Sequence, residues 1–173
     1  CDVIDGDGTL IVGAEPGAWT GGGGDDNWST AENWVAGIVP QSGHLRADLS
    51  AAVSDAAPVR ALLLDISAVT NSQLALNSGI AGAVVTNTCP AGVTNTLYLA
   101  AEGVIEVGAG ETLVLDHDLC IMGSIYKRGE GVLVLRRNTY TLPSLVSSYS
   151  AGCYITVDGG KVINEGPMAN VMI

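Results

Sequence analysis

The stretch ETLVLDHDLCIMGSIYKRGEGVLVL, residues 111–135, contains two pairs of leucines, Leu113 with Leu115 and Leu133 with Leu135. Within each pair the leucines lie two positions apart, which is the period at which side chains return to one face of a β-strand. The turn-forming sequence KRGEG directly precedes the strand that carries the second pair. The stretch therefore predicts short strands joined by glycine-containing turns.

Three more leucine pairs precede this stretch: Leu62/Leu64, Leu74/Leu76 and Leu97/Leu99. The first leucines of the five pairs lie at positions 62, 74, 97, 113 and 133, so their separations are 12, 23, 16 and 20 residues. Short strands at loosely repeating intervals, with almost no helical pattern, predict an all-β fold. The separation near 20 favours a β-solenoid, similar to a parallel β-helix, whose stacked turns form inward apolar ladders. The irregular separations keep a β-sandwich as the alternative.

The composition narrows the function classes. Of the 173 residues, 47% are hydrophobic and 14% are charged, which suits one domain or one elongated module. The 18 acidic and 7 basic residues give a net charge of −11, which repels nucleic-acid phosphates and anionic membrane surfaces. The longest apolar runs fall far short of the roughly 20 residues that span a bilayer. No phosphate loop, nucleophile elbow or zinc-protease motif occurs, so we expect neither enzyme activity nor a cofactor.

The segment AWTGGGGDDNWSTAENWVAGIVP, residues 18–40, contains all three tryptophans of the chain, Trp19, Trp28 and Trp34. A solenoid end exposes unpaired backbone groups and an open apolar column that need cover. Each tryptophan can bury on the order of 200 Å², so we interpret the segment as an N-terminal cap. The alternative is a sugar-binding platform on which the tryptophan rings stack against saccharides.

The polar residues of the same segment fit either interpretation. Gly21–Gly24 allow the chain to turn across the end of the solenoid. Asp25 and Asp26 follow them and can supply turn hydrogen bonds, or polar contacts to a saccharide in the alternative.

We divide the chain into three segments of one structural unit. Residues 1–17 form an N-terminal strand segment, residues 18–59 the tryptophan- and glycine-rich capping segment, and residues 60–173 the solenoid-like repeat region. The boundaries follow the change from a single apolar run to the tryptophan cluster and then to the leucine pairs.

Residues 125–163 contain, in order, Lys-x-Gly-x-Gly-x-Leu-x-Leu, Asn-Thr-Tyr-Thr and Thr-Val-x-Gly-Gly-x-Val. This order resembles one unit of the autotransporter-associated β-strand repeat of bacterial surface and secreted proteins. The tryptophan segment is similar to the Trp-Thr-Gly … Asn-Trp-Ser … Asn-Trp … Pro sequence that often precedes such repeats. The resemblance implies an exported, β-helical, non-catalytic scaffold, located outside the cell or on its surface. The matching positions are Lys127, Gly129, Gly131, Leu133, Leu135, Asn138, Thr139, Tyr140, Thr141, Thr156, Val157, Gly159, Gly160 and Val162.

Four cysteines, Cys1, Cys89, Cys120 and Cys153, allow three complete pairings and contain no CxxC zinc signature. We favour secretion with disulfides over free thiols in the core. Cys120 with Cys153 is the preferred pair because both lie in strand-like segments, and Cys1 with Cys89 follows by elimination. The start at Cys1 suggests a processed mature end, a lipid-modified end or a fragment end.

Two acidic clusters are candidates for metal sites. In a strand, Asp116 and Asp118 share one face while His117 points to the other, so one ion cannot easily collect all three. Asp5 and Asp7 are weak calcium candidates because the remaining ligands of a calcium loop are missing. We interpret the first cluster as a polar rim where a strand leaves the coil and the second as a solvated turn, and we predict no metal site.

Apolar residues at both ends of the chain indicate self-association. The N-terminal sequence TLIV can add a strand to the edge of a neighbouring copy, unless it pairs within its own chain. A strand with two apolar faces and an apolar C-terminus without a polar cap favour the same interpretation. The alternative for that strand is that the insertion near residues 142–149 folds back over its valines. The residues concerned are Leu10, Ile11, Val12, Val132, Val134, Val171 and Ile173.

The sequence therefore predicts a secreted or cell-surface structural or adhesion module that associates end to end into a homo-oligomer, fibre or surface layer. The alternative is a carbohydrate-binding module that holds a polysaccharide with its tryptophan segment.

Overall fold

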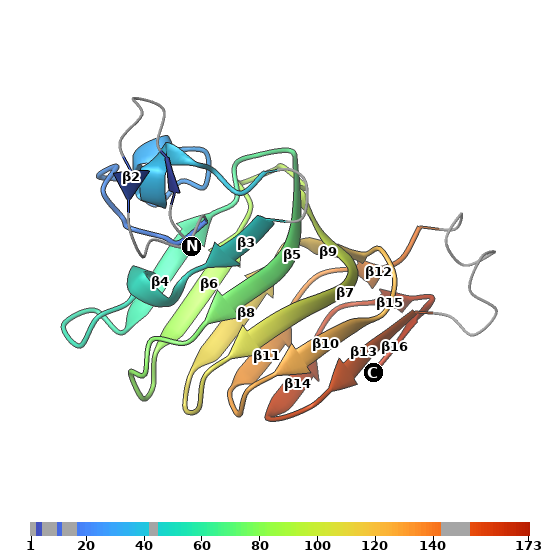
Figure 1. Ribbon diagram of the computed structural model, residues 1–173. Coiled ribbons are helices and arrows are strands. Elements are labelled where there is room, and N and C mark those ends of the chain that lie inside the picture. The colour runs from blue at the N-terminus through green and yellow to red at the C-terminus, as the bar shows by residue number, and fades with distance from the viewer. Residues whose placement is uncertain (1–2, 5–9, 12–16, 42–44, 143–152) are drawn as a thin grey trace.

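The computed structural model of the chain describes residues 3–4, 10–11, 17–41, 45–142 and 153–173, and within them the fold is all-β (Figure 1). This content confirms the prediction of an all-β fold. None of the helical elements in these residues has the length or apolar character needed to cross a membrane. The helical elements are single 3₁₀ turns: η1 (Ala31–Asn33), η2 (Val35–Gly37) and η3 (Ser50–Ala52).

The strands from β3 onward lie in three rows, and the pairing within each row is parallel. The first row consists of β3 (Leu45–Asp48), residues 73–76 of β5 (Ala68–Leu76), residues 104–107 of β7 (Thr96–Val107), β10 (Ile125–Arg128), β13 (Cys153–Val157) and β16 (Val171–Met172). The second row consists of β4 (Val59–Leu63), β6 (Val84–Thr88), β8 (Thr112–Asp116), β11 (Val132–Leu135) and β14 (Lys161–Asn164). The third row consists of residues 68–71 of β5, residues 96–99 of β7, β9 (Asp118–Ile121), β12 (Thr139–Tyr140) and β15 (Met168–Ala169).

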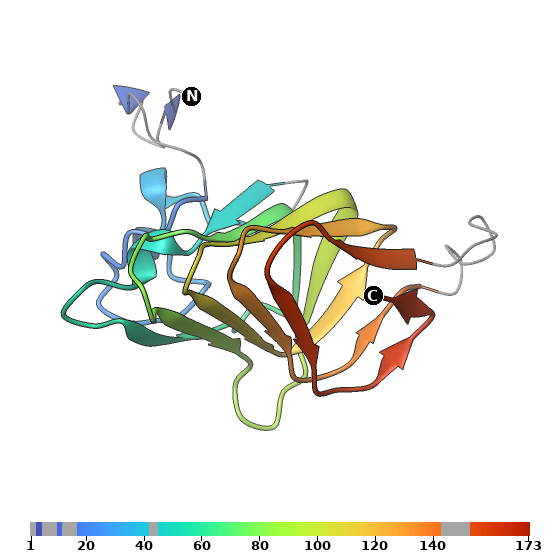
Figure 2. The same cartoon turned by 90° about the horizontal axis from the view of Figure 1, so that it is seen from below.

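The chain visits these rows in a fixed order. From β3 to β15 it passes through the first, second and third row and then returns to the first. Each return places a strand beside its predecessor in the same direction, which is why the pairs are parallel. Figures 1 and 2 show the resulting stack, with the blue N-terminal segment at one end and the red strands β13 to β16 at the other.

Inward side chains of successive strands form apolar columns, and nearly all of their members are buried. Burying one leucine or valine side chain contributes roughly 1.5–3 kcal/mol, so the columns supply the main stabilising term. The best aligned columns are Val85–Leu113–Leu133 in the second row, Val69–Leu97–Leu119 in the third and Leu74–Ile105 in the first.

The rows explain the irregular leucine separations. Leu113 is the register partner of Leu133, so their 20-residue separation is one complete passage through the three rows. Leu74 lies in the first row and Leu97 in the third, so the other separations join different rows. Parallel pairing does not agree with the sandwich alternative, whose sheets are antiparallel.

The tryptophan segment, residues 18–40, lies against the first strands of the stack. The backbone N–H of Trp19 donates to the carbonyl of Asp48 at 2.8 Å, and that of Trp28 donates to the carbonyl of Leu63 at 2.9 Å. The segment therefore pairs with both β3 and β4 at the edge where each row begins.

The N-terminal apolar run forms a strand in its described part. The strand β2 (Leu10–Ile11) pairs antiparallel with β1 (Val3–Ile4). One side of the predicted exchange strand is thus paired within its own chain, as the sequence interpretation allowed. Thr9 and Val12 lie outside the described residues.

Candidate functional site

The three tryptophans form one buried cluster. The rings of Trp19 and Trp34 meet edge to face with centroids 5.0 Å apart, and those of Trp28 and Trp34 lie 4.8 Å apart. The indole N–H of Trp28 donates to the carbonyl of Pro40 at 3.0 Å, and that of Trp34 donates to the carbonyl of Trp28 at 2.8 Å. Since no ring is more than 2% exposed, the cluster presents no ring face to a saccharide.

The acidic residues beside the cluster hold its loop together. Asp25 accepts hydrogen bonds from the backbone of Asn27 at 3.1 Å and from the side chains of Asn27, Thr30 and Asn33. The bond from the Asn27 backbone is the main cause that lowers the pKa of Asp25. Asp26 accepts from Arg60 Nε of β4 at 2.9 Å. Both carboxylates are therefore committed to contacts within the chain.

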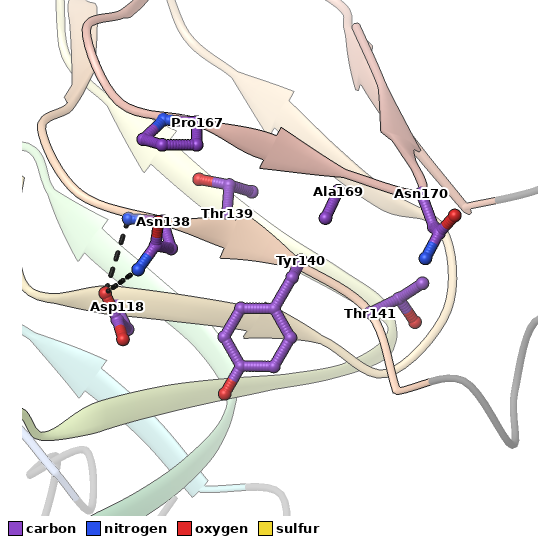
Figure 3. Close-up of a pocket in the computed structure, with 8 residues that line it drawn as sticks. All are labelled: Asp118, Asn138, Thr139, Tyr140, Thr141, Pro167, Ala169 and Asn170. Carbon is purple, nitrogen blue, oxygen red and sulfur yellow. Dashed lines mark hydrogen bonds between the residues drawn. The ribbon is translucent and has the colours of Figure 1, made fainter.

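A hollow of about 390 Å³ lies against β9, β12 and β15 (Figure 3), and Figure 1 shows β12 and β15 on the opposite side of the molecule from the tryptophan segment. At about 30 Å³ for each water molecule, this space corresponds to roughly a dozen waters. Figure 3 shows Tyr140 projecting between Asp118 and Asn138 on one side and Asn170 on the other. Asp118 Oδ1 accepts from the backbone N–H and the Nδ2 of Asn138, at 3.3 and 3.2 Å.

The tyrosine of the hollow has a second tyrosine on the same face of the third row. Tyr98, Cys120 and Tyr140 are successive register partners, so the two tyrosines lie two strands apart. Burial is the main cause that raises the pKa of Tyr98. The ring of Tyr140 is a half-buried wall of the hollow.

The Asp-His-Asp sequence does not form a metal site. His117 is 1% exposed at the corner between β8 and β9, and its Nε2 has no hydrogen-bond partner among the described residues. Asp116 faces Arg137 Nε at 3.1 Å, whereas Asp118 bonds to Asn138. Within the described part of the chain, no three His, Cys, Asp or Glu side chains converge on one point. The calcium candidates Asp5 and Asp7 lie outside the described residues.

The described cysteines carry free, buried thiols at positions 89, 120 and 153, and Cys1 lies outside the described residues. The preferred Cys120–Cys153 disulfide is therefore not present in this structure. Cys153 Sγ instead donates to the hydroxyl of Thr141 at 3.3 Å. Burial raises the pKa of Cys120 to about 11, so its thiol stays protonated and unreactive near neutral pH.

An interior lysine is a feature that the sequence reasoning missed. Lys127 takes the column position between Ile105 and Val157 and is fully buried. Its Nζ donates to the carbonyls of Arg128 at 3.0 Å, Gly129 at 2.7 Å and Gly159 at 2.9 Å. The ammonium group thus ties the corner after β10 to the corner after β13. The signal was present in the Lys-x-Gly-x-Gly motif, whose glycines bring the carbonyls within reach.

The sequence analysis also missed the hollow, although half of its lining residues lie in the repeat-like stretch 125–163. The four consecutive residues of the Asn-Thr-Tyr-Thr element, positions 138–141, all line it. In the sequence they count only as repeat matches, because the other lining residues Asp118 and Asn170 come from β9 and from the bend after β15.

The predicted self-association residues differ in exposure. Val134 is 7% exposed because its parallel neighbours Val114 and Ile163 cover it, and Val132 is half-buried. Val171 is buried, whereas Ile173 is 55% exposed. The apolar surface of this region therefore lies at the last edge of the stack and not on the outer face of β11.

No protein-family model, curated protein or solved structure matches this chain.

Proposed function

We propose that the protein is a β-solenoid that serves as a secreted or cell-surface structural or adhesion module and associates with further copies of itself. The observation that carries the proposal is the asymmetry of the stack. Its first edge is covered by the tryptophan segment, whereas its last edge, formed by β14, β15 and β16, has strand partners on one side only among the described strands.

Three further features support a structural role. The rows recur in one order from β3 to β15, which is the arrangement of a coiled chain with stacked turns. The described acidic and basic groups are largely occupied by contacts within the chain, as at Asp25, Asp26 and Asp116. The composition, with a net charge of −11, favours solubility and argues against nucleic-acid partners.

The self-association is tested by sedimentation velocity of the parent chain over a wide range of concentrations. We expect species larger than the 17.6 kDa chain, in proportions that rise with concentration. A single 17.6 kDa species at the highest concentration would contradict the proposal.

The hollow beside Tyr140 favours a second candidate function, the binding of a neutral saccharide. An aromatic wall flanked by amides and a carboxylate offers both an apolar face and hydrogen-bonding groups, the combination that fixes ring-shaped polyols. The buried tryptophans make this hollow a better candidate than the tryptophan segment.

This second function is tested by isothermal titration of the parent chain with neutral oligosaccharides, such as β-linked glucose or N-acetylglucosamine oligomers. Tyr140→Ala should abolish any heat of binding, whereas Tyr154→Ala, a substitution of an exposed tyrosine in β13, should leave it unchanged. Equal binding by both variants would contradict the assignment of the hollow.

A further inference from the structure

We propose that two copies of this chain join through the last edge of the second row, with the strand β14 of each copy paired antiparallel to the other about a two-fold axis at Ile163. This inference rests on the proposed self-association and assigns its surface, its register and its symmetry. The second copy would extend the five-stranded sheet of the second row into one continuous sheet, from β4 of one copy to β4 of the other.

The backbone of β14 restricts the register. The N–H groups of Lys161 and Glu165 donate to the carbonyls of Gly131 and Leu135 at 3.1 and 2.8 Å, so these residues face β11. Since successive residues of a strand face opposite neighbours, Val162 and Asn164 direct their backbone groups to the edge that has no partner among the described strands. Pairing Val162 with Asn164 of a second copy lets each pair exchange two backbone hydrogen bonds, and the symmetry supplies two such pairs.

The same register places complementary side chains opposite one another. The outward residues are Lys161, Ile163 and Glu165, in line with Val132 and Val134 of β11. About the axis at Ile163, each Lys161 lies opposite the Glu165 of the other copy, and the two Ile163 side chains meet between these ion pairs. Both charged side chains are exposed, and Glu165 also reaches Arg136 of its own chain at 3.4 Å. Opposite charges and apolar residues are the cross-strand pairs that stabilise antiparallel strands.

The opposite edge does not offer a comparable surface. There the tryptophan segment pairs with β3 and β4, so a head-to-tail contact would have to displace it. Apolar side chains instead surround the last edge, where Met172 is 49% and Ile173 is 55% exposed. A contact between two last edges is isologous and closes on itself, which predicts a dimer rather than a filament.

Charge reversal tests the pairing at about 0.15 M salt, where repulsion between the two acidic chains is screened beyond about 8 Å. Lys161→Glu places glutamates opposite one another at both ends of β14, and Glu165→Lys does the same with lysines. Each variant should dimerise at least about 10-fold more weakly than the parent, because like charges directly opposite destabilise paired strands. Thermal unfolding of each variant, close to that of the parent, excludes misfolding as the cause.

Mixing the two variants provides the decisive measurement. In a mixed dimer, the glutamate introduced at position 161 of one variant faces the lysine introduced at position 165 of the other. The unaltered Glu165 of the first variant likewise faces the unaltered Lys161 of the second, so both ion pairs are restored. Native mass spectrometry and sedimentation should detect the mixed dimer at concentrations at which each variant alone is mainly monomeric.

The remaining outcomes separate the two proposals. A parent that assembles while both variants assemble equally well would overturn this register and leave the proposed function standing. A parent that stays monomeric at every concentration would overturn both.

Discussion

At both edges of the stack the terminal strands have backbone groups that no further strand of the stack pairs with, but only the first edge is covered by another segment of the described chain. At the first edge, β3 and β4 receive backbone hydrogen bonds from residues 17–41, and three indole rings cover the end of the interior columns. At the last edge, β14 to β16 leave backbone groups unpaired among the described strands and leave Met172 and Ile173 exposed. An unpaired strand edge can pair with another chain, and only the first edge is covered by another segment of the described residues.

The largest expected effect concerns the covered edge. Trp34 contacts both other tryptophans and is 2% exposed, so Trp34→Ala should lower the free energy of unfolding by about 3–5 kcal/mol, the range for emptying a large aromatic site. The matched control at the other edge is Met172→Ala, which should cost less than about 0.5 kcal/mol because the side chain is exposed. Chemical denaturation of both variants measures the difference, and equal losses would remove the distinction between the edges.

Much of this fold could be predicted from the sequence. The period-2 leucines identified strands, and Leu113 with Leu133 gave the length of one passage through the rows. The tryptophan segment was interpreted as a cap because a solenoid end needs cover, and in the structure it pairs with β3 and β4 and buries its three rings. The other leucine separations were not interpretable, since Leu74 and Leu97 belong to different rows and the corner lengths vary.

The candidate site was less predictable, for a physical reason. Asp118, Tyr140 and Asn170 line one hollow because β9, β12 and β15 lie side by side and Asn170 directly follows β15, and the sequence does not specify that register. The burial of Lys127 was not predicted because a lysine in a strand is ordinarily expected to face solvent. Its three carbonyl partners come from corners whose shape appears only after folding.

A second prediction probes whether the two edges belong to one cooperative unit. Burial is the main cause that lowers the pKa of His117 from 6.5 to about 4, while Asp116 and Asp118 act to raise it and Arg137 acts to lower it. Because the unfolded chain binds the proton more tightly, stability is full above about pH 7 and falls as the pH drops from 6.5 toward 4. The loss should reach about 3 kcal/mol at about pH 4.

The control for this acid loss is His117→Gln, which cannot titrate in that range. The variant should unfold with a much flatter pH dependence over the same interval, measured by denaturation at each pH. His117 lies midway along the stack, so a cooperative fold predicts equal acid loss of protection at both edges in hydrogen exchange. Loss confined to β14 to β16 would show that the last edge unfolds on its own.

The smallest effect is expected near the last edge, at Lys127. Lys127→Met keeps the length of the side chain but leaves the carbonyls of Arg128, Gly129 and Gly159 without their donor. Leaving partly buried acceptors unpaired is unfavourable, while removing a buried ammonium group offsets part of that cost. We therefore expect a net loss of about 1–2 kcal/mol, smaller than that at Trp34.

The region in which Lys127→Met lowers stability distinguishes the two edges more clearly than the size of the stability loss. Since Lys127 Nζ joins the corners after β10 and β13, hydrogen exchange should accelerate at the backbone amides of residues 158–165 and stay unchanged at Trp19 and Trp28, which pair with the first strands. The neighbouring substitution Arg128→Met removes an exposed cation that faces Asp158 at 3.6 Å and should change neither region, because exposed ion pairs contribute little. Uniform acceleration of hydrogen exchange along the whole chain in Lys127→Met would mean that the lysine stabilises the entire stack. The difference between the two edges would then not extend to this residue.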